Sequence, residues 1–252
     1  MKHFINCILL IFIICVPIFS QTDADCAEAK NKNARYEKQL SDWAQLARYR
    51  EANLKIVPPT KDERRVVFMG DSITDGWNLA EYFSAKPYIN RGISGQTTPQ
   101  MLVRFRADVI DLKPKVVVIL AGTNDIAGNT GPMSLEDTAQ NLISMAELAR
   151  ANNIRVVLAS VLPVSDRLKN KEGVLLVQTR SRANEKIMAM NALIKKYAGD
   201  NNLVYLDYYA ATVDKDGTLK DGTSYDGLHP NADGYKIMQP LAEQAIARAL
   251  QK

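Results

Sequence analysis

Cysteine and histidine are scarce in this chain of 252 residues, which contains three cysteines and two histidines. Only Cys26 and His229 lie beyond the first twenty residues. A single cysteine forms no intrachain disulfide, and one cysteine with one histidine is too few for a Cys/His zinc site. After loss of the first twenty residues, the chain therefore has neither a disulfide scaffold nor a multi-histidine metal centre.

Glycine and proline are also few, with 13 and 10 residues, and no five like charges follow one another. This composition excludes a collagen-like or low-complexity chain. The net charge of +4 comes from 32 basic and 28 acidic residues, a mild excess that gives no support for nucleic-acid binding. A chain of this length buries a sizeable core without disulfides.

One long apolar run occurs, over residues 4–19, behind a short basic start and ahead of Ser20-Gln21. The pattern is typical of a secretory signal peptide over residues 1–20. The run is shorter than the roughly 20 residues that span a bilayer, so we expect no stable membrane span after cleavage. The sequence predicts a secreted or periplasmic protein, and an uncleaved N-terminal membrane anchor is the alternative.

A helical extension and linker are predicted over residues 21–60. The polar stretch 23–54 lacks proline and glycine, and it carries Leu40, Trp43, Leu46 and Tyr49 in steps of three, as along one face of a helix. Pro58-Pro59 ends the pattern. The sequence alone assigns this helix no role beyond packing.

Residues 61–252 are predicted to form one domain, because short apolar runs alternate there with helical patterns. The predicted strands cover residues 66–69, 88–90, 116–120, 156–159 and 203–206, and the predicted helices 99–109, 134–152, 180–198 and 232–250. Such alternation predicts an α/β fold with a five-stranded parallel sheet and helices on both faces. Functional residues are then expected at the carboxyl ends of the strands.

A serine follows the first predicted strand, in Gly-Asp-Ser-Ile at residues 70–73. At a turn from strand to helix, Ser72 would be exposed at the rim with its N–H at a helix start, a suitable place for a nucleophile and a developing oxyanion. The alternative is that Asp71, Ser72 or Thr74 merely caps the helix.

Polar groups also follow the second and third strands. Gly92 and Gly95 lie in a tight loop where backbone N–H groups could approach a ligand, although a turn with Thr98 as helix cap explains the loop equally well. Asn124 follows the third strand, where its amide could donate to an oxyanion or simply form a turn.

The last polar motif is Asp-Gly-Leu-His at residues 226–229, in a loop that opens the final helix. A carboxylate three residues before an imidazole can orient it through a ring N–H. A lone histidine is more often structural. His229 is nevertheless the best candidate for a base, because no other histidine remains beyond the signal segment.

Together these groups supply a nucleophile, oxyanion donors, an orienting acid and a base. The blocks at residues 70–73, 92–95, 122–125 and 226–229 resemble the four signature blocks of the GDSL, or SGNH, family of serine esterases and lipases. Ile73 stands where the family name has leucine. The resemblance extends from about residue 66 to residue 250. Within the family, the chain is similar to the branch of lysophospholipases, thioesterases and platelet-activating-factor acetylhydrolases.

The resemblance implies a three-layer α/β/α, flavodoxin-like SGNH hydrolase fold, with the N-terminal helix as an addition. It implies Ser72 as nucleophile, Asp226 and His229 as the rest of a triad, and an oxyanion hole made by the Ser72 and Gly95 N–H groups with the Asn124 amide. No metal or organic cofactor is needed. The implied activity is hydrolysis of carboxylic esters through an acyl-enzyme.

The substrate is open at this point. Residues 174–177 are apolar and could line an acyl pocket for a lipid ester, or begin the next helix. Tyr208, Tyr209 and Tyr225 could stack on an acetylated sugar, or simply pack. Lysophospholipid-type hydrolysis leads, carbohydrate O-acetylesterase activity is the alternative, and a non-catalytic binding protein on the same scaffold is the rival class.

Overall fold

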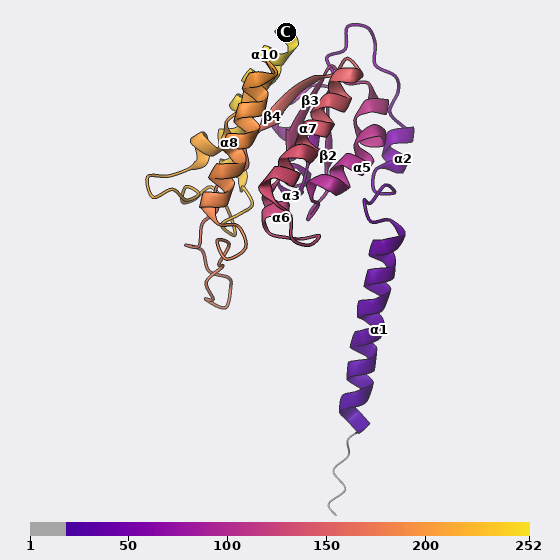
Figure 1. Cartoon of the computed structure of the whole chain (residues 1–252), viewed down its shortest axis with the longest axis vertical. Helices are drawn as coiled ribbons and strands as arrows, with labels where there is room; N and C mark the ends of the chain where they lie inside the picture. The colour runs from indigo at the N-terminus through magenta and orange to yellow at the C-terminus, as the bar shows by residue number, and fades with distance from the viewer. Residues whose placement is uncertain (1–18) are drawn as a thin grey trace, which may run out of the picture. The chain divides into compact units, whose positions relative to one another are not determined.

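The computed structural model describes residues 19–252 (Figure 1). These residues divide into two compact units, one that ends at Trp43 and one that covers Ala44–Lys252. The first unit contains helix α1 (Phe19–Ser41), on which Cys26 is an exposed free thiol. The predicted signal peptide lies almost wholly outside the described residues. Within residues 19–252, no helix is both long enough and apolar enough to cross a membrane.

The single helix expected over residues 23–54 is interrupted. Helix α1 ends at Ser41, Gln45 adopts a left-handed φ of 54°, and a short helix α2 (Arg50–Leu54) follows. Tertiary contacts override helical propensity here. The Tyr49 hydroxyl donates to the Gly92 carbonyl and its ring lies 4.5 Å from the Arg91 guanidinium.

The second unit is built on one five-stranded sheet in which every pairing is parallel, as predicted. The spatial order is β2-β1-β3-β4-β5. The strands are β1 (Val66–Gly70), β2 (Tyr88–Gly92), β3 (Val116–Leu120), β4 (Arg155–Ala159) and β5 (Val204–Leu206).

Helices cover both faces of the sheet because successive side chains of a strand point to opposite sides. On β1, Val67 and Met69 join a core with helices α5 (Thr98–Asp108), α7 (Leu135–Ala151) and α8 (Asn184–Asp200). Val66 and Phe68 join the opposite core, with α10 (Ala232–Gln251) and the short helices α3 (Ser72–Asp75), α4 (Leu79–Tyr82) and α9 (Tyr208–Thr212). The three-layer α/β/α fold is therefore confirmed.

The strand order places a topological switch point between β1 and β3. From these neighbours the chain proceeds to β2 on one side and to β4 and β5 on the other. In open α/β sheets, ligands bind outside the carboxyl ends of the strands at such a point. The segments that follow β1 and β3 are therefore the first place to look for chemistry.

A buried ion pair between Arg104 and Asp108 lies next to the end of β1. The Arg104 side chain on α5 is fully buried, and it donates to Asp108 Oδ2 at 3.0 Å, to Gln96 Oε1 at 2.6 Å and to the Gly70 carbonyl at 3.1 Å. Burial lowers the pKa of Arg104, and Asp108 opposes that shift. The guanidinium thereby ties the end of β1 to the loop after β2.

Replacing Asp108 with alanine is expected to lower the free energy of unfolding by about 3–5 kcal/mol, because it leaves a buried cation without its partner. Urea denaturation measures the change. Asp111→Ala is the matched control, since Asp111 pairs with Arg106 at 3.9 Å on the surface and such pairs contribute about 0–1 kcal/mol. Equal losses in the two variants would contradict this assignment.

Candidate active site

Ser72 is the first residue of helix α3, directly after β1 and Asp71. Asp71, not Ser72, caps the helix, because its carboxylate accepts from the Ile73 N–H at 3.0 Å. The Ser72 hydroxyl is left to interact with His229 Nε2 at 2.8 Å. Within residues 19–252, the Ser72 N–H donates no hydrogen bond.

His229 and Asp226 lie in the loop before α10, and Asp226 Oδ2 is 2.6 Å from His229 Nδ1. The other carboxylate oxygen accepts from the N–H groups of Leu228 and His229 at 2.9 and 2.7 Å. Partial burial raises the pKa of Asp226, but these hydrogen bonds outweigh it and lower the pKa to about 2. Asp226 is therefore ionised at neutral pH and holds the imidazole ring in place.

Two neighbours shape this loop. Ser224 Oγ donates to the His229 carbonyl at 2.7 Å and accepts from the Gly227 N–H at 2.9 Å, which closes the turn. The Tyr225 ring stacks on the imidazole with centroids 5.7 Å apart and an interplanar angle of 11°. The histidine is thus oriented from one side by Asp226 and covered by an aromatic face.

The two glycines after β2 have different roles. A Cβ at Gly92 would lie 2.1 Å from the Asp75 backbone nitrogen, so this glycine permits close packing of α3 on β2. Gly95 has open space around it and a left-handed φ of 80°. Its carbonyl accepts from Asn129 Nδ2 at 3.0 Å, and its N–H has no acceptor in the described part of the chain.

Asn124 is buried on helix α6 (Thr123–Ile126), directly after β3. Its Nδ2 donates to the Gln96 carbonyl at 3.0 Å, and its Oδ1 accepts from Arg182 Nη2 at 3.1 Å. An amide nitrogen carries two hydrogens, so one N–H of Asn124 remains available for a ligand.

One cleft of about 580 Å³ brings these groups together. Ser72, Gly95, Asn124 and His229 all line it, and Asp226 lies behind the histidine. The rest of its wall is mostly polar: Asp75, Gly76, Ser94, Asn129, Arg182, Tyr225 and Leu228. The cleft therefore holds a hydroxyl hydrogen-bonded to an imidazole, beside two backbone N–H groups and a side-chain amide.

Comparison with known proteins agrees with this arrangement. The sequence model of the GDSL-like Lipase/Acylhydrolase family matches residues 68–237. The chain belongs to this family. A GDSL-like lipase from Bacteroides thetaiotaomicron is 44% identical, with a TM-score of 0.73 and coverage of 82% of this chain and 98% of that one.

Two curated relatives are more distant. The platelet-activating factor acetylhydrolase IB subunit alpha2 of Rattus norvegicus is 28% identical over 207 residues, which are 78% of this chain and 82% of that protein. The uncharacterized lipoprotein YqeF of Bacillus subtilis is 34% identical over 118 residues, which are 39% of this chain and 49% of that protein. The prediction of an ester-hydrolysing enzyme of the GDSL family is confirmed.

Some expectations for this GDSL protein need correction. Helix α5 is capped by Thr97, whose N–H donates to Gln100 Oε1 at 3.0 Å, and not by Thr98. Thr98 instead donates from its N–H and hydroxyl to Asp125 Oδ1 at 2.9 and 2.5 Å, which joins the loops after β2 and β3. Tertiary pairing with Asp125 outweighs a local cap at this position.

The groups considered for substrate contact also differ from expectation. Tyr208 is buried, where its ring lies 6.4 Å from that of Trp77, and of the three tyrosines only Tyr225 lines the cleft. The apolar stretch 174–177 neither lines the cleft nor begins helix α8, which starts at Asn184. Val174, Leu175 and Val177 are exposed on a loop.

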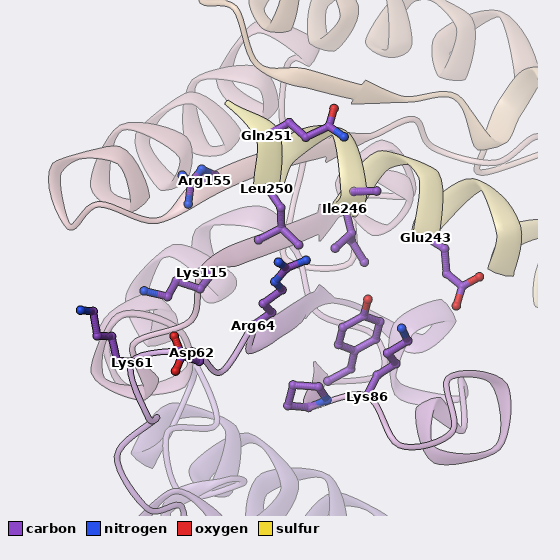
Figure 2. A pocket seen from close by; sticks show the side chains of 13 residues that line it. Lys61, Asp62, Arg64, Lys86, Lys115, Arg155, Glu243, Ile246, Leu250 and Gln251 are labelled. Carbon is purple, nitrogen blue, oxygen red and sulfur yellow. The ribbon is translucent and has the colours of Figure 1, made fainter.

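A larger hollow of about 900 Å³ lies at the opposite, amino ends of the strands (Figure 2). Its wall is basic and includes Lys61, Arg64, Lys86, Lys115 and Arg155, with Ile246 and Leu250 from α10. Its lining contains no serine, cysteine or histidine, whereas the smaller cleft is lined by Ser72 and His229. No cluster of three His, Cys, Asp or Glu side chains suited to a metal occurs among residues 19–252.

Asp71, beside Ser72, is almost fully buried, and burial raises its pKa from 3.8 to about 6. In the unfolded chain Asp71 ionises near its ordinary pKa of 3.8. Between about pH 4 and pH 6 the unfolded chain therefore binds fewer protons than the folded protein. The contribution of Asp71 to stability therefore falls as pH rises from about 4 to about 6. Two pKa units correspond to about 3 kcal/mol.

Asp71→Asn is expected to remove this penalty, since an amide oxygen still accepts from the Ile73 N–H. Urea unfolding of both proteins at pH 4, 5, 6 and 7 measures it. The free energy of unfolding of Asp71→Asn should rise relative to that of the parent protein as pH rises, and the difference should be largest above about pH 6. Parallel stability curves over this range would contradict the buried-acid assignment.

Arg182 and Ser224 are the site residues that sequence reasoning missed. Ser224 stands two residues before Asp226, and a hydroxyl at a turn is the only local signal it gives. Arg182 lies in a loop 58 residues from Asn124, so no spacing rule connects the two.

Proposed function

We propose that this chain hydrolyses carboxylic esters through an acyl-enzyme formed on Ser72. The observation that carries the proposal is the hydrogen-bonded series from Ser72 Oγ to His229 Nε2 at 2.8 Å and from His229 Nδ1 to Asp226 Oδ2 at 2.6 Å. With Nδ1–H donated to the carboxylate, Nε2 carries the lone pair and accepts the serine proton.

The reaction proceeds in two halves. Ser72 Oγ attacks the ester carbonyl while His229 takes its proton, and the tetrahedral intermediate then collapses as His229 protonates the leaving alkoxide. A water molecule repeats the sequence on the acyl-enzyme and releases the acid. Asp226 keeps the imidazole in the required tautomer and does not itself take the proton.

The oxyanion of each tetrahedral intermediate would be held by three donors. These are the N–H groups of Ser72 and Gly95, which have no acceptor in the described part of the chain, and the second N–H of the Asn124 amide. Donors fixed in advance where charge develops stabilise the transition state more than the ground state.

The substrate class that fits the cleft is a short acyl ester of a polar alcohol. Apart from Leu228 and the Tyr225 ring, the cleft residues are polar or glycine, and a long acyl chain would gain little from entering it. The acetylhydrolase relative, named for removal of an acetyl group, supports this choice.

The test is hydrolysis of p-nitrophenyl esters from acetate to palmitate, beside acetylated xylan and lysophosphatidylcholine. We expect kcat/KM to be highest for acetate and to fall with chain length, and the natural-type substrates to identify the alcohol. A preference for palmitate and lysophosphatidylcholine would overturn the short-acyl assignment.

Hydrolysis of lysophospholipid-type long acyl esters is the second candidate. One observation favours it: the exposed apolar side chains Val174, Leu175 and Val177 lie next to Gln178, which donates to the Asp226 carbonyl at 3.0 Å. Deletion of this apolar character by Leu175→Ser with Val177→Ser separates the two candidates. Loss of activity on long esters alone would favour the second.

We propose a secreted or periplasmic location, on the strength of the signal-like residues 1–20 and the lipoprotein relative. The protein recovered outside the cytoplasm should begin near Gln21. N-terminal sequencing tests this. Recovery of the protein with Met1 from a membrane fraction would support the uncleaved anchor instead.

A further inference from the structure

Arg182 lies in the wall of the cleft that holds Ser72 and His229, and its hydrogen bonds go to Asn124 and Ser181 rather than to either of those residues. It stands just before helix α8, whose first residue, Asn184, exchanges hydrogen bonds with Val164: Nδ2 donates to the carbonyl at 3.0 Å and Oδ1 accepts from the N–H at 2.9 Å. On the other side, Gln178 Nε2 donates to the Asp226 carbonyl at 3.0 Å. Both ends of the loop are therefore fixed to the core or to the site.

The guanidinium makes few contacts for a half-buried cation. Nη2 donates to Asn124 Oδ1 at 3.1 Å and Nη1 donates to Ser181 Oγ at 3.1 Å. Nε is buried without a partner among the described residues. Among residues 19–252, no carboxylate forms a salt bridge with Arg182, although the charges of Asp71 and Asp226 oppose the lowering of its pKa by burial. Of the residues that line the cleft, the Arg182 guanidinium donates a hydrogen bond to Asn124.

The Asn124 amide is held at both ends. Arg182 donates to its oxygen, and the Gln96 carbonyl accepts from its nitrogen at 3.0 Å. Rotation of the amide by half a turn would set its NH₂ against the guanidinium and its oxygen against the Gln96 carbonyl, and both contacts would be repulsive. A hydrogen bond from a cation is also stronger than a neutral one and polarises the amide it binds.

We propose that Arg182 is a positioning residue, which fixes the Asn124 amide with its free N–H directed into the cleft and strengthens that N–H as an oxyanion donor. The inference rests on the proposed function, because it assigns Arg182 to the transition state of that reaction. A role in packing alone, or in binding the ground-state substrate, gives different kinetics.

Arg182→Ala should lower kcat by about 10- to 100-fold with little change in KM, as expected when a transition-state donor is misplaced. Added guanidinium chloride at non-denaturing concentration should restore part of the kcat of Arg182→Ala and none of that of Asn124→Ala. Arg182→Lys, which retains a cation, should lose less than Arg182→Ala. Arg180→Ala is the matched control, since Arg180 is exposed two residues away and does not line the cleft.

A double-mutant cycle completes the test. Asn124→Ala alone should cost about 100- to 1000-fold in kcat, the usual loss of one oxyanion donor. In the double variant, Arg182→Ala should lower kcat by less than about 3-fold relative to Asn124→Ala alone, because Arg182 acts through the Asn124 amide, which that variant lacks. Losses that simply multiply, or a loss in KM alone, would overturn the positioning role.

Ser72→Ala, assayed on the same ester, separates the two claims. Inactive Ser72→Ala with fully active Arg182→Ala would refute the Arg182 inference and leave the proposed function standing. Activity retained by Ser72→Ala would refute the proposed function itself. If circular dichroism and thermal unfolding show that Arg182→Ala does not fold, Arg182→Lys replaces it in the test. A lower kcat with little change in KM would support the positioning role, and an unchanged kcat would overturn it.

Discussion

Replacing Ser72 with alanine is expected to lower kcat for ester hydrolysis by about a million-fold, the loss seen when a serine hydrolase loses its nucleophile. The hydroxyl is the only group that can form the acyl-enzyme in the proposed mechanism. The fold should be unaffected, because Asp71 caps helix α3 and the Ser72 hydroxyl interacts with His229 in the cleft rather than with the core. Steady-state hydrolysis of p-nitrophenyl acetate measures the effect.

His229→Ala should be as inactive as Ser72→Ala, and the double variant little worse than either, because nucleophile and base act as one unit. Ser94→Ala is the matched control. Ser94 lines the same cleft, but its hydroxyl donates to Asp75 Oδ2 at 2.6 Å and has no contact with His229. A large loss from Ser94→Ala with an active Ser72→Ala would reassign the nucleophile.

Asp226→Asn is expected to lower kcat by about 10,000-fold while leaving the protein folded, as when an amide replaces the orienting acid of a triad and selects the wrong tautomer. The carboxylate accepts three hydrogen bonds from residues 228 and 229, and an amide can present its NH₂ to the imidazole instead. The hydroxyl of Ser72 then faces a protonated Nε2 that cannot accept its proton.

The low pKa of Asp226 sharpens this prediction. The folded-state pKa of about 2 lies below the ordinary value, so the stability that ionised Asp226 contributes is present above about pH 4 and is lost as pH falls toward 2. Because Asp226 stays ionised above about pH 5, its own titration adds no pH dependence to the loss from Asp226→Asn between pH 5 and 9. Asp233→Asn, on the exposed first turn of α10, is the control and should retain near-parental activity.

The sheet and most of the candidate site could be predicted because their signals are local. Continuous apolar runs such as residues 116–120 mark strands covered on both faces, and the strand-end rule placed Ser72, Gly95 and Asn124 at one edge of the sheet. In the structure, Ser72, Gly95, Asn124 and His229 share one cleft, and Asp226 stands behind the histidine.

The features that could not be predicted depend on contacts between distant segments. The expected helix over residues 23–54 ends early because Tyr49 pairs with Gly92 and Arg91. Thr98 does not cap helix α5 as expected, because its N–H and hydroxyl donate to Asp125. Arg182 contacts Asn124 because the start of α8 is hydrogen-bonded to the loop after β4, a contact between distant segments. The sequence around Arg104 likewise gives no sign that its side chain is buried.

Covalent labelling with a fluorophosphonate, followed by intact mass and peptide mapping, tests the central claim most directly. A fluorophosphonate phosphonylates an activated serine, so it reports the nucleophile without any assumption about the natural ester. We predict one adduct per chain, on Ser72, absent from Ser72→Ala and strongly reduced in His229→Ala. An adduct on another residue, or none in a protein that hydrolyses esters, would contradict the assignment of Ser72 as the nucleophile.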